Sequence, residues 1–362
     1  MPEKYVVIMA GGRGERFWPQ SRLRKPKHLL PIVGETSMLG QTIDRLEGLV
    51  PTENIFVITN TEQRDAVLEV CPGLSPENVI GEPVGRDTAP AVGLAALLVK
   101  RRDPQGVFAI LPADHVIHDH DGFQRVLRAG FDAASSEPVL VTIGIEPTYP
   151  ATGYGHIHKG AEWTTFDGLQ AYRVQRFVEK PDLETAQGYF DSGEYFWNAG
   201  MFIWAVSTVE DAFAKHSPSH ARDFAEMNKA LDAGEPLDAA MTRFYPEMEK
   251  ISVDFALMEK ADNVVTLPSA FDWDDVGEWP AVARHHEPDA AGNVLKGPAM
   301  VESGSNNIIV STKGHLTAVV GADDLIVVHT DDATLVCPKA RAQEIKALVK
   351  RIGADAALKH LT

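Results

Sequence analysis

The sequence has only two cysteines, lacks long apolar runs and carries less positive than negative charge. Cys71 and Cys337 show no Cys-x-x-Cys or other paired spacing, which excludes a disulfide framework and a cysteine zinc site and is typical of a reducing compartment. No apolar run reaches the ~18–20 residues of a membrane span, and the N-terminus shows no charged-then-apolar leader. We therefore expect a cytoplasmic protein without a membrane partner.

The balance of charge narrows the classes of ligand. Lys and Arg number 34 and Asp and Glu number 51, so the net charge is −17. A chain this acidic repels a nucleic-acid backbone, and we expect no nucleic-acid partner. Phosphate ligands are not excluded, because acidic proteins bind them through Mg²⁺ and a few local cations. The length of 362 residues predicts about two domains.

Up to about residue 145, strand and helix patterns alternate. Strands are predicted at 5–10, 54–59, 106–111 and 138–145, and helices at 37–49, 88–102 and 121–135. Thr88 is the predicted N-cap of the helix at 88–102. This alternation favours right-handed βαβ units and a mostly parallel sheet covered on both faces, which is an α/β fold.

The pattern changes twice further along the chain. From 150 to 290 strands and helices mix, with strands near 154–158, 172–179 and 201–204 and helices at 182–191, 207–215, 219–232 and 252–260. After residue 290, short β segments are predicted at 300–302, 307–310, 316–320, 325–328 and 334–337. Gly, Asp and Asn separate them, which is typical of a small all-β unit. A helix at 340–351 follows.

A glycine-rich loop follows the first predicted strand. Gly11, Gly12 and Gly14 let the backbone turn tightly and present its N–H groups to an anion. The dinucleotide pattern GxGxxG fails because Phe17 takes the place of its third glycine, and GxxxxGK[ST] is absent. We therefore place a nicotinamide-dependent oxidoreductase last among the alternatives.

Three cations accompany this loop in an otherwise acidic chain. Arg13, Arg16 and Lys27 stand close together in sequence, as a triphosphate requires, since its charge needs several donors at once. The alternative is a solvated loop with surface cations.

Two acidic motifs are candidate metal sites. Asp114, in LPADH, follows a predicted strand, where open α/β sheets bind ligands. The segment 271–279, FDWDDVGEW, has three aspartates that would repel one another without a cation. Mg²⁺ often takes one or two carboxylates and completes its shell with phosphate and water. The alternatives are a capping Asp and an exposed acidic turn.

The motifs GGRGERFWPQS and KPKHLL together resemble the signature of sugar-1-phosphate nucleotidyltransferases. The first motif contains a Trp-Pro pair, and this form of it is similar to the motif of the mannose-1-phosphate guanylyltransferase branch. The resemblance extends from Val6 to about Leu348. It implies a Rossmann-like nucleotidyltransferase domain with a mixed, mostly parallel sheet at 1–288, and a short β-helix-like domain with a terminal helix at 289–362. Bifunctional relatives carry an isomerase domain after this point, and we expect none here.

The resemblance also implies roles for individual residues. The nucleotide would be bound by Ala10, Gly11, Gly12, Arg13, Gly14, Arg86, Asp87 and Thr88. Arg16 and Lys27 would contact the leaving pyrophosphate, and Asp114 and Asp275 would hold Mg²⁺. The sugar phosphate would contact Gly155, Glu179, Lys180 and Asn198 in the motifs TGYGHI, FVEKP and WNAGMF, with Lys180 on the phosphate. His28 departs from the family, which most often has Gln there.

The implied reaction is transfer of GMP from GTP to mannose-1-phosphate, which gives GDP-mannose and pyrophosphate. Two alternatives share the fold: transfer with another nucleotide or hexose-1-phosphate, and a catalytically inactive regulatory subunit. Asp114, Asp275, Lys27 and Lys180 argue against the inactive subunit, which has no need of them. The sequence leaves the oligomeric state open, with a homodimer as one candidate.

Overall fold

The computed structural model describes residues 2–362, and these divide into two compact units. The larger unit comprises 2–11, 43–113 and 117–273, and the smaller comprises 12–42, 114–116 and 274–362. The chain thus changes unit five times, after Gly11, Thr42, Ala113, Val116 and Trp273. The changes after Gly11, Ala113 and Trp273 lie inside sequence motifs. The domain boundary expected at 288/289 does not coincide with the division into these two units, and it stays a prediction.

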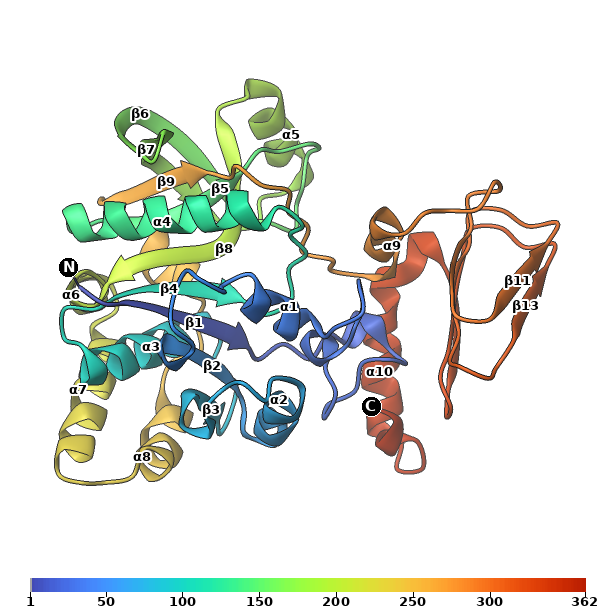
Figure 1. Ribbon diagram of the computed structural model, residues 1–362, viewed down its shortest axis with the longest axis horizontal. Coiled ribbons are helices and arrows are strands. Elements are labelled where there is room, and N and C mark those ends of the chain that lie inside the picture. The colour runs from blue at the N-terminus through green and yellow to red at the C-terminus, as the bar shows by residue number, and fades with distance from the viewer. Residues whose placement is uncertain (1) are drawn as a thin grey trace. The chain divides into compact units, whose positions relative to one another are not determined.

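The larger unit contains a nine-stranded mixed sheet (Figure 1). Its strand order is β3-β2-β1-β4-β8-β5-β9-β7-β6. The strands are β1 (Lys4–Ala10), β2 (Ile55–Asn60), β3 (Val79–Glu82), β4 (Val107–Pro112), β5 (Leu140–Ile145), β6 (His156–Phe166), β7 (Leu169–Val178), β8 (Tyr195–Ala205) and β9 (Val264–Pro268). β1, β2, β3 and β4 pair in parallel, as do β5 and β9. β6, β7 and β8 pair antiparallel with their neighbours, so the sheet is mixed, as expected. It is not mostly parallel, because five of its pairings are antiparallel and four are parallel.

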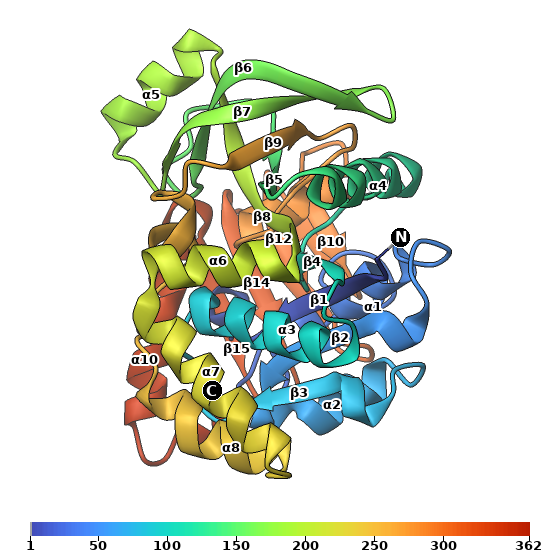
Figure 2. The ribbon, with the colours of Figure 1, turned by 90° about the vertical axis from the view of Figure 1, so that its left-hand side faces the viewer.

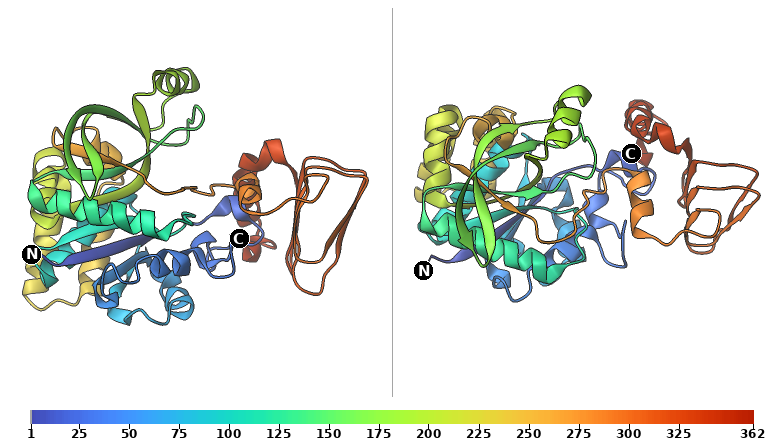
Figure 3. Two further views of the ribbon diagram at one scale, coloured as in Figure 1. Left: turned by 45° about the horizontal axis from the view of Figure 1, so that its top comes forward. Right: turned by 90° about the horizontal axis from the view of Figure 1, so that it is seen from above.

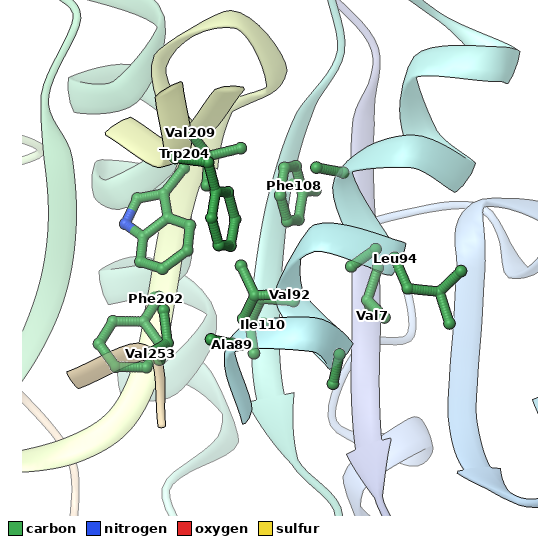
Figure 4. Packing of buried hydrophobic residues seen from close by; sticks show 14 of the residues in the cluster. Val7, Ala89, Val92, Leu94, Phe108, Ile110, Phe202, Trp204, Val209 and Val253 are labelled. Atoms are coloured by element: carbon green, nitrogen blue, oxygen red, sulfur yellow. The ribbon is translucent and has the colours of Figure 1, made fainter. Parts of the chain in front are cut away.

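Helices cover both faces of this sheet. They are α2 (Arg64–Val70), α3 (Thr88–Arg102), α4 (His120–Ser136), α5 (Leu183–Ser192), α6 (Val206–His216), α7 (Pro218–Asp232) and α8 (Leu237–Phe244). Successive side chains of a strand point to opposite faces. Phe202 and Trp204 of β8 pack in the core cluster of α3 and α6 (Figure 4), whereas Ile203 lies against Gly130 of α4. Figure 2 accordingly shows α3, α6 and α7 grouped together, apart from α4.

Most elements predicted for the larger unit are found within a few residues, and two predictions are wrong. The N-cap of α3 is Asp87, whose carboxylate accepts a hydrogen bond from the Thr88 N–H at 2.8 Å. The Thr88 hydroxyl instead accepts from the N–H of Val253 at 2.8 Å. The segment predicted as a helix at 252–260 forms a π-helix at Asp254–Met258. β3, β9, α2 and α8 are additional to the prediction.

The smaller unit contains the coil of short strands that Figure 3 shows. The strands are β10 (Val294–Lys296), β11 (Ala299–Glu302), β12 (Ile308–Val310), β13 (Thr317–Val320), β14 (Leu325–His329) and β15 (Thr334–Pro338). β10, β12 and β14 stack in parallel, as do β11 and β13, whereas β15 pairs antiparallel with β14. Asn307 is fully buried between turns, accepting from the Leu325 N–H at 2.9 Å and donating to Asn293 Oδ1 at 3.0 Å. This architecture confirms the expected β-helix-like region.

The core of the smaller unit joins this coil to the glycine-rich loop. It includes α9 (Trp279–Val282) and α10 (Ile345–Ala354), while α1 (Met38–Asp44) crosses the division between the units. The residue that stands in place of a third glycine, Phe17, is buried, and its ring meets that of Trp279 edge-on at 5.2 Å between centroids. This packing brings the loop and the acidic 271–279 motif together. Among residues 2–362, no helix is both long and apolar enough to cross a membrane.

Candidate functional site

The glycine-rich loop is shaped by a close approach to Lys27. Gly14 has a φ of 61°, and a Cβ added to it would lie 2.4 Å from the Cβ of Lys27. Only glycine fits this backbone conformation and this contact without strain. The Ser21 hydroxyl donates to the Gly14 carbonyl at 2.6 Å and holds the turn. The glycine at this position therefore lets the loop pack directly on Lys27, the first residue of a short 3-10 helix at Lys27–Leu29.

The ammonium of Lys27 joins the two acidic motifs. It donates to Asp114 Oδ2 at 2.8 Å, to the Asp114 carbonyl at 2.9 Å and to the Asp275 carbonyl at 2.7 Å. A lysine ammonium has three N–H donors, so these oxygens use all of them. The side chain is only 5% exposed. Lys27 thereby fixes Asp114 beside the backbone of Asp275, far from it in sequence.

A cavity of about 450 Å³ opens over these residues within the smaller unit. It is lined by Arg13, Gly14, Glu15, Arg16, Phe17, Lys27, Asp114, His115, Asp275, Gly277 and Lys346. We call it the phosphate cavity. Six residues selected from the sequence thus line one space, whereas Gly12 does not line it. Lys346 was not predicted, because it lies on α10 in no recognisable motif.

Arg16 has unused hydrogen-bonding capacity in this wall. Its Nη1 donates to the Gly277 carbonyl at 3.4 Å, and its buried Nε has no partner within residues 2–362. Buried polar atoms are normally paired, so an unpaired one calls for an explanation such as a ligand. The guanidinium therefore has the character of an anion-binding group.

The three aspartates of the 271–279 motif have separate environments. Asp272, in the larger unit, accepts from the backbone N–H groups of His118 and Asp119 at 2.9 and 2.8 Å. Asp274 forms two 2.7 Å hydrogen bonds with Arg284 and one of 2.9 Å with His285. Of the three, Asp275 lines the phosphate cavity. The mutual repulsion expected from sequence is relieved because two of the carboxylates have protein partners.

Electrostatics keep Asp114 charged and His28 neutral. Burial by itself raises the pKa of the Asp114 carboxyl, but the Lys27 ammonium, aided by His115, lowers that pKa below its ordinary value. Burial lowers the pKa of His28 to about 4, although the Asp114 carboxylate opposes this change, and Lys27 adds to the lowering. At neutral pH His28 is therefore an uncharged imidazole, and its buried Nε2 has no partner within residues 2–362.

The donor set suits a hard divalent cation that also binds phosphate. Asp114 and Asp275 present carboxylates at one cavity, but no group of three or more His, Cys, Asp or Glu is placed to hold a metal ion in the described part of the chain. Mg²⁺ commonly uses one or two carboxylates with substrate oxygens and water, so a two-carboxylate site is compatible with it.

A second cluster of predicted residues lies in the larger unit. A Cβ on Gly155 would lie 2.7 Å from Glu179 Oε2, and the Gly155 carbonyl accepts from the Asn198 N–H at 2.8 Å. Lys180 Nζ donates to Glu179 Oε1 at 2.6 Å. The structure thus brings together all four residues expected to contact the sugar phosphate, and we call them, with Asp254, the EK cluster.

Asp254 is a member of the EK cluster that the sequence did not identify. Its Oδ1 accepts from Asn198 Nδ2 at 3.1 Å. Burial, with the negative charge of Glu179, raises the pKa of Asp254 to about 7. Burial lowers the pKa of Lys180, but its hydrogen bond and charge contact with Glu179 outweigh this and raise it overall. Its segment was predicted to be an ordinary helix, which hid this placement.

The segments expected to bind the nucleoside also lie in the larger unit. Asp87 has a φ of 69°, a strained conformation for a residue with a side chain and one found most often at functional sites. The buried Nε of Arg86 has no partner within the described residues. Ala10 is buried at the end of β1, and a Cβ on Gly11 would lie 3.4 Å from Glu82 Oε2.

Comparisons with known proteins agree with these features. The family model for nucleotidyl transferases matches residues 5–291, and that for the MannoseP isomerase/GMP-like beta-helix domain matches 299–352. The mannose-1-phosphate guanylyltransferase of Escherichia coli K12 is 40% identical over 364 residues, which cover 98% of this chain and 75% of that protein. That of Sinorhizobium fredii is 38% identical over 369 residues, with 100% and 70% covered.

A solved structure is similar over the whole length. It is a crystal structure from Thermus thermophilus named mannose-1-phosphate geranyltransferase, with a TM-score of 0.85 and 35% sequence identity. The match covers 97% of this chain and 99% of that chain. Together with the family models, it confirms the α/β nucleotidyltransferase fold with a C-terminal β-helix-like part.

Proposed function

Because this chain belongs to the nucleotidyl transferase family and is similar along its length to mannose-1-phosphate guanylyltransferases, we propose that it transfers GMP from GTP to mannose-1-phosphate. The products are GDP-mannose and pyrophosphate. The observation that carries the proposal is the phosphate cavity, where a glycine loop, several cations and two carboxylates meet in an acidic chain.

The reaction needs no covalent intermediate on the enzyme. An oxygen of the sugar phosphate attacks the α-phosphorus in line, and the bond from that phosphorus to the oxygen that bridges the α- and β-phosphates of GTP breaks. That oxygen leaves as a terminal oxygen of pyrophosphate. The chain's task is to position two polyanions and stabilise the charge that develops. In this proposal the loop of Gly11, Gly12 and Gly14 holds the nucleotide phosphates, and Arg13 and Arg16 contact them.

Lys27 contributes in two ways. Its positive charge lies in the wall of the phosphate cavity, where the leaving group develops negative charge. Its hydrogen bonds also hold Asp114 and the backbone of Asp275 in place. These contacts support a role for Lys27 in both electrostatic stabilisation and the organisation of the carboxylates.

We assign Mg²⁺ to Asp114 and Asp275. The metal supplies positive charge to phosphate oxygens when it is bound. Lys27 keeps the Asp114 carboxylate ionised and therefore ready to act as a ligand.

The EK cluster is assigned to the sugar phosphate. Lys180 holds the attacking phosphate, while Glu179, Asn198 and the backbone of Gly155 accept or donate hydrogen bonds with sugar hydroxyls. Arg86, Asp87 and Thr88 are assigned to the base and ribose. The close packing of the cluster and the strained φ of Asp87 support these roles.

Pyrophosphate release from purified protein tests the proposal. GTP, ATP, UTP and dTTP are each paired with mannose-1-phosphate and with glucose-1-phosphate in Mg²⁺ buffer. Release mainly from GTP with mannose-1-phosphate supports it. Release from a different pair keeps the reaction class and replaces the substrates, and no release from folded protein with any pair favours an inactive regulatory subunit.

We also propose that the chain forms a homodimer. Met300, Ala318 and Val320 lie on one exposed face of the β11–β13 sheet, and Met300 and Val320 are 62% and 75% exposed. Contiguous exposed apolar side chains are typical of interaction surfaces. Light scattering after size exclusion should give the mass of a dimer for the unsubstituted protein. The Val320→Lys variant should give a lower average mass, because the added charge weakens the dimer. A monomer in the unsubstituted protein contradicts this.

A cytoplasmic location is the last part of the proposal. Cys71 and Cys337 are free and buried, which is compatible with a reducing compartment. Cell fractionation tests it, and recovery of the protein outside the cytoplasmic fraction contradicts it.

A further inference from the structure

The phosphate cavity raises a question about which cations meet the leaving pyrophosphate. The Lys27 ammonium already gives its three donors to oxygens of Asp114 and Asp275. Pyrophosphate leaves with several negative charges, and each needs charge-assisted hydrogen bonds once water is displaced. Cations with unused donors must therefore supply much of this stabilisation.

Lys346 is such a cation. It lines the phosphate cavity from α10, and its ammonium has no hydrogen bond or ion pair within residues 2–362. Arg13 lines the same cavity and its guanidinium likewise has no partner among those residues. Both stand in the wall that also holds Arg16, which has a buried, unpaired Nε.

The next lysine along the helix has a different position. Lys350 lies one turn beyond Lys346 on the same face of α10. It lines a neighbouring cavity of about 690 Å³, which Arg13 and Lys346 share, but it does not line the phosphate cavity. The two lysines match in chemistry, helix and exposure class, and they differ in access to the phosphate cavity.

We propose that Lys346 of the C-terminal helix binds the pyrophosphate end of the nucleotide and, with Arg13, stabilises the leaving group. This inference rests on the proposed function. As the α-phosphorus bonds to the sugar-phosphate oxygen, the electron pair of the broken bond goes to the former α–β bridging oxygen of GTP, which becomes a terminal oxygen of pyrophosphate. The Lys346 ammonium lowers the energy of that charge without transferring its proton.

This role gives α10 a task in catalysis besides packing. Ile345 and Val349 on the buried side of the helix belong to the core of the smaller unit. That packing fixes the adjacent position of Lys346 at the cavity wall. The β-helix-like part and its terminal helix therefore contribute a substrate contact to the nucleotidyltransferase site.

The test compares Lys346→Met with the matched control Lys350→Met, and uses Lys346→Arg for rescue. Kinetics are measured in both directions, with pyrophosphate and GDP-mannose as the substrates of the reverse reaction. Hydrogen bonds between charged groups are stronger than neutral ones, so Lys346→Met should raise the KM for pyrophosphate about tenfold or more. The KM for mannose-1-phosphate should stay unchanged, Lys350→Met should behave as the unsubstituted enzyme, and Lys346→Arg should recover most of the loss.

Three outcomes would overturn the inference. One is an unchanged KM for pyrophosphate in Lys346→Met, and another is an equal rise in Lys350→Met. The third is a parallel rise in the KM for mannose-1-phosphate, which would indicate a merely structural effect. If the unsubstituted protein shows no activity, the proposed function fails. Calorimetric titration with pyrophosphate and Mg²⁺ then tests whether Lys346 binds pyrophosphate. Equal affinity of the Lys346→Met and unsubstituted proteins would then overturn the inference.

Discussion

At the scale of the residue, neighbouring aspartates have different tasks because each meets different partners. Asp274 is held by Arg284 and His285, whereas Asp275 lines the phosphate cavity. The sequence identified the acidic cluster, and the resemblance selected Asp275 within it. Spacing alone could not make that choice, because Arg284 and His285 belong to no motif. Lys346 was missed for the same reason.

Asparagine substitutions separate these two tasks. Asp275→Asn should lower turnover by at least ~10²-fold, since it removes charge at the proposed metal site. Asp274→Asn should lower the free energy of unfolding by about 2 kcal/mol, because it weakens hydrogen bonds to charged groups. Steady-state kinetics and urea denaturation measure the two effects. Near-normal turnover in Asp275→Asn would remove it from the mechanism.

Asp254 gives the EK cluster a pH dependence. Its pKa is raised to about 7, chiefly by burial, so it is protonated below that pH and ionised above it. Ionisation adds negative charge beside the proposed phosphate site, and the KM for mannose-1-phosphate should therefore rise as the pH increases through about 7. Asp254→Asn should flatten this profile relative to Asp262→Asn, an exposed control.

The comparison between these two variants removes the titration of the sugar phosphate itself, whose second pKa is about 6. Identical KM profiles in Asp254→Asn and Asp262→Asn would contradict the assignment.

At the scale of the element, the sequence predicted best where hydrophobic periodicity decides the structure. β1, α3 and α4 are found close to their predicted bounds because their apolar residues are buried in the core. The N-cap of α3 was misplaced because the Thr88 hydroxyl is used by a distant backbone group, the N–H of Val253. Long-range contacts of this kind leave no local signal.

The coil of the smaller unit depends on Asn307. Replacing it by Ala leaves the Leu325 N–H and the Ala322 carbonyl without their partner. Each unsatisfied buried group costs about 1–3 kcal/mol, so Asn307→Ala should lower the free energy of unfolding by at least about 2 kcal/mol.

Asn306→Gly is the matched control for this change. Asn306 is exposed and has a φ of 56°, which glycine adopts readily. The stabilities of Asn307→Ala and Asn306→Gly are compared by their midpoints of denaturant unfolding. Equal midpoints would show that the buried amide contributes little.

At the scale of the whole molecule, motifs far apart in sequence belong to two compact units. Residues 12–42, 114–116 and 274–362 form one unit, so the phosphate cavity combines the first loop with the C-terminal helix. The resemblance implied that Asp114 and Asp275 act together, whereas hydrophobic patterns gave no means of pairing them. The contact through Lys27 required the structure.

Removal of the metal tests the carboxylate assignment for the whole enzyme. EDTA should abolish pyrophosphate release, and added Mg²⁺ should restore it, because two carboxylates beside polyphosphate leave negative charge that needs neutralising. Calcium-saturated EDTA is the control for effects of the chelator itself. Full activity in excess EDTA would contradict the assignment.

The most direct test of the account is the fate of the α-phosphorus of GTP. The protein is incubated with mannose-1-phosphate, Mg²⁺ and GTP radiolabelled at that atom, and the products are separated. We predict that the label enters GDP-mannose in an amount equal to the pyrophosphate released, with none bound to protein. Label in free GMP or on the protein, or no conversion at all, would contradict direct GMP transfer.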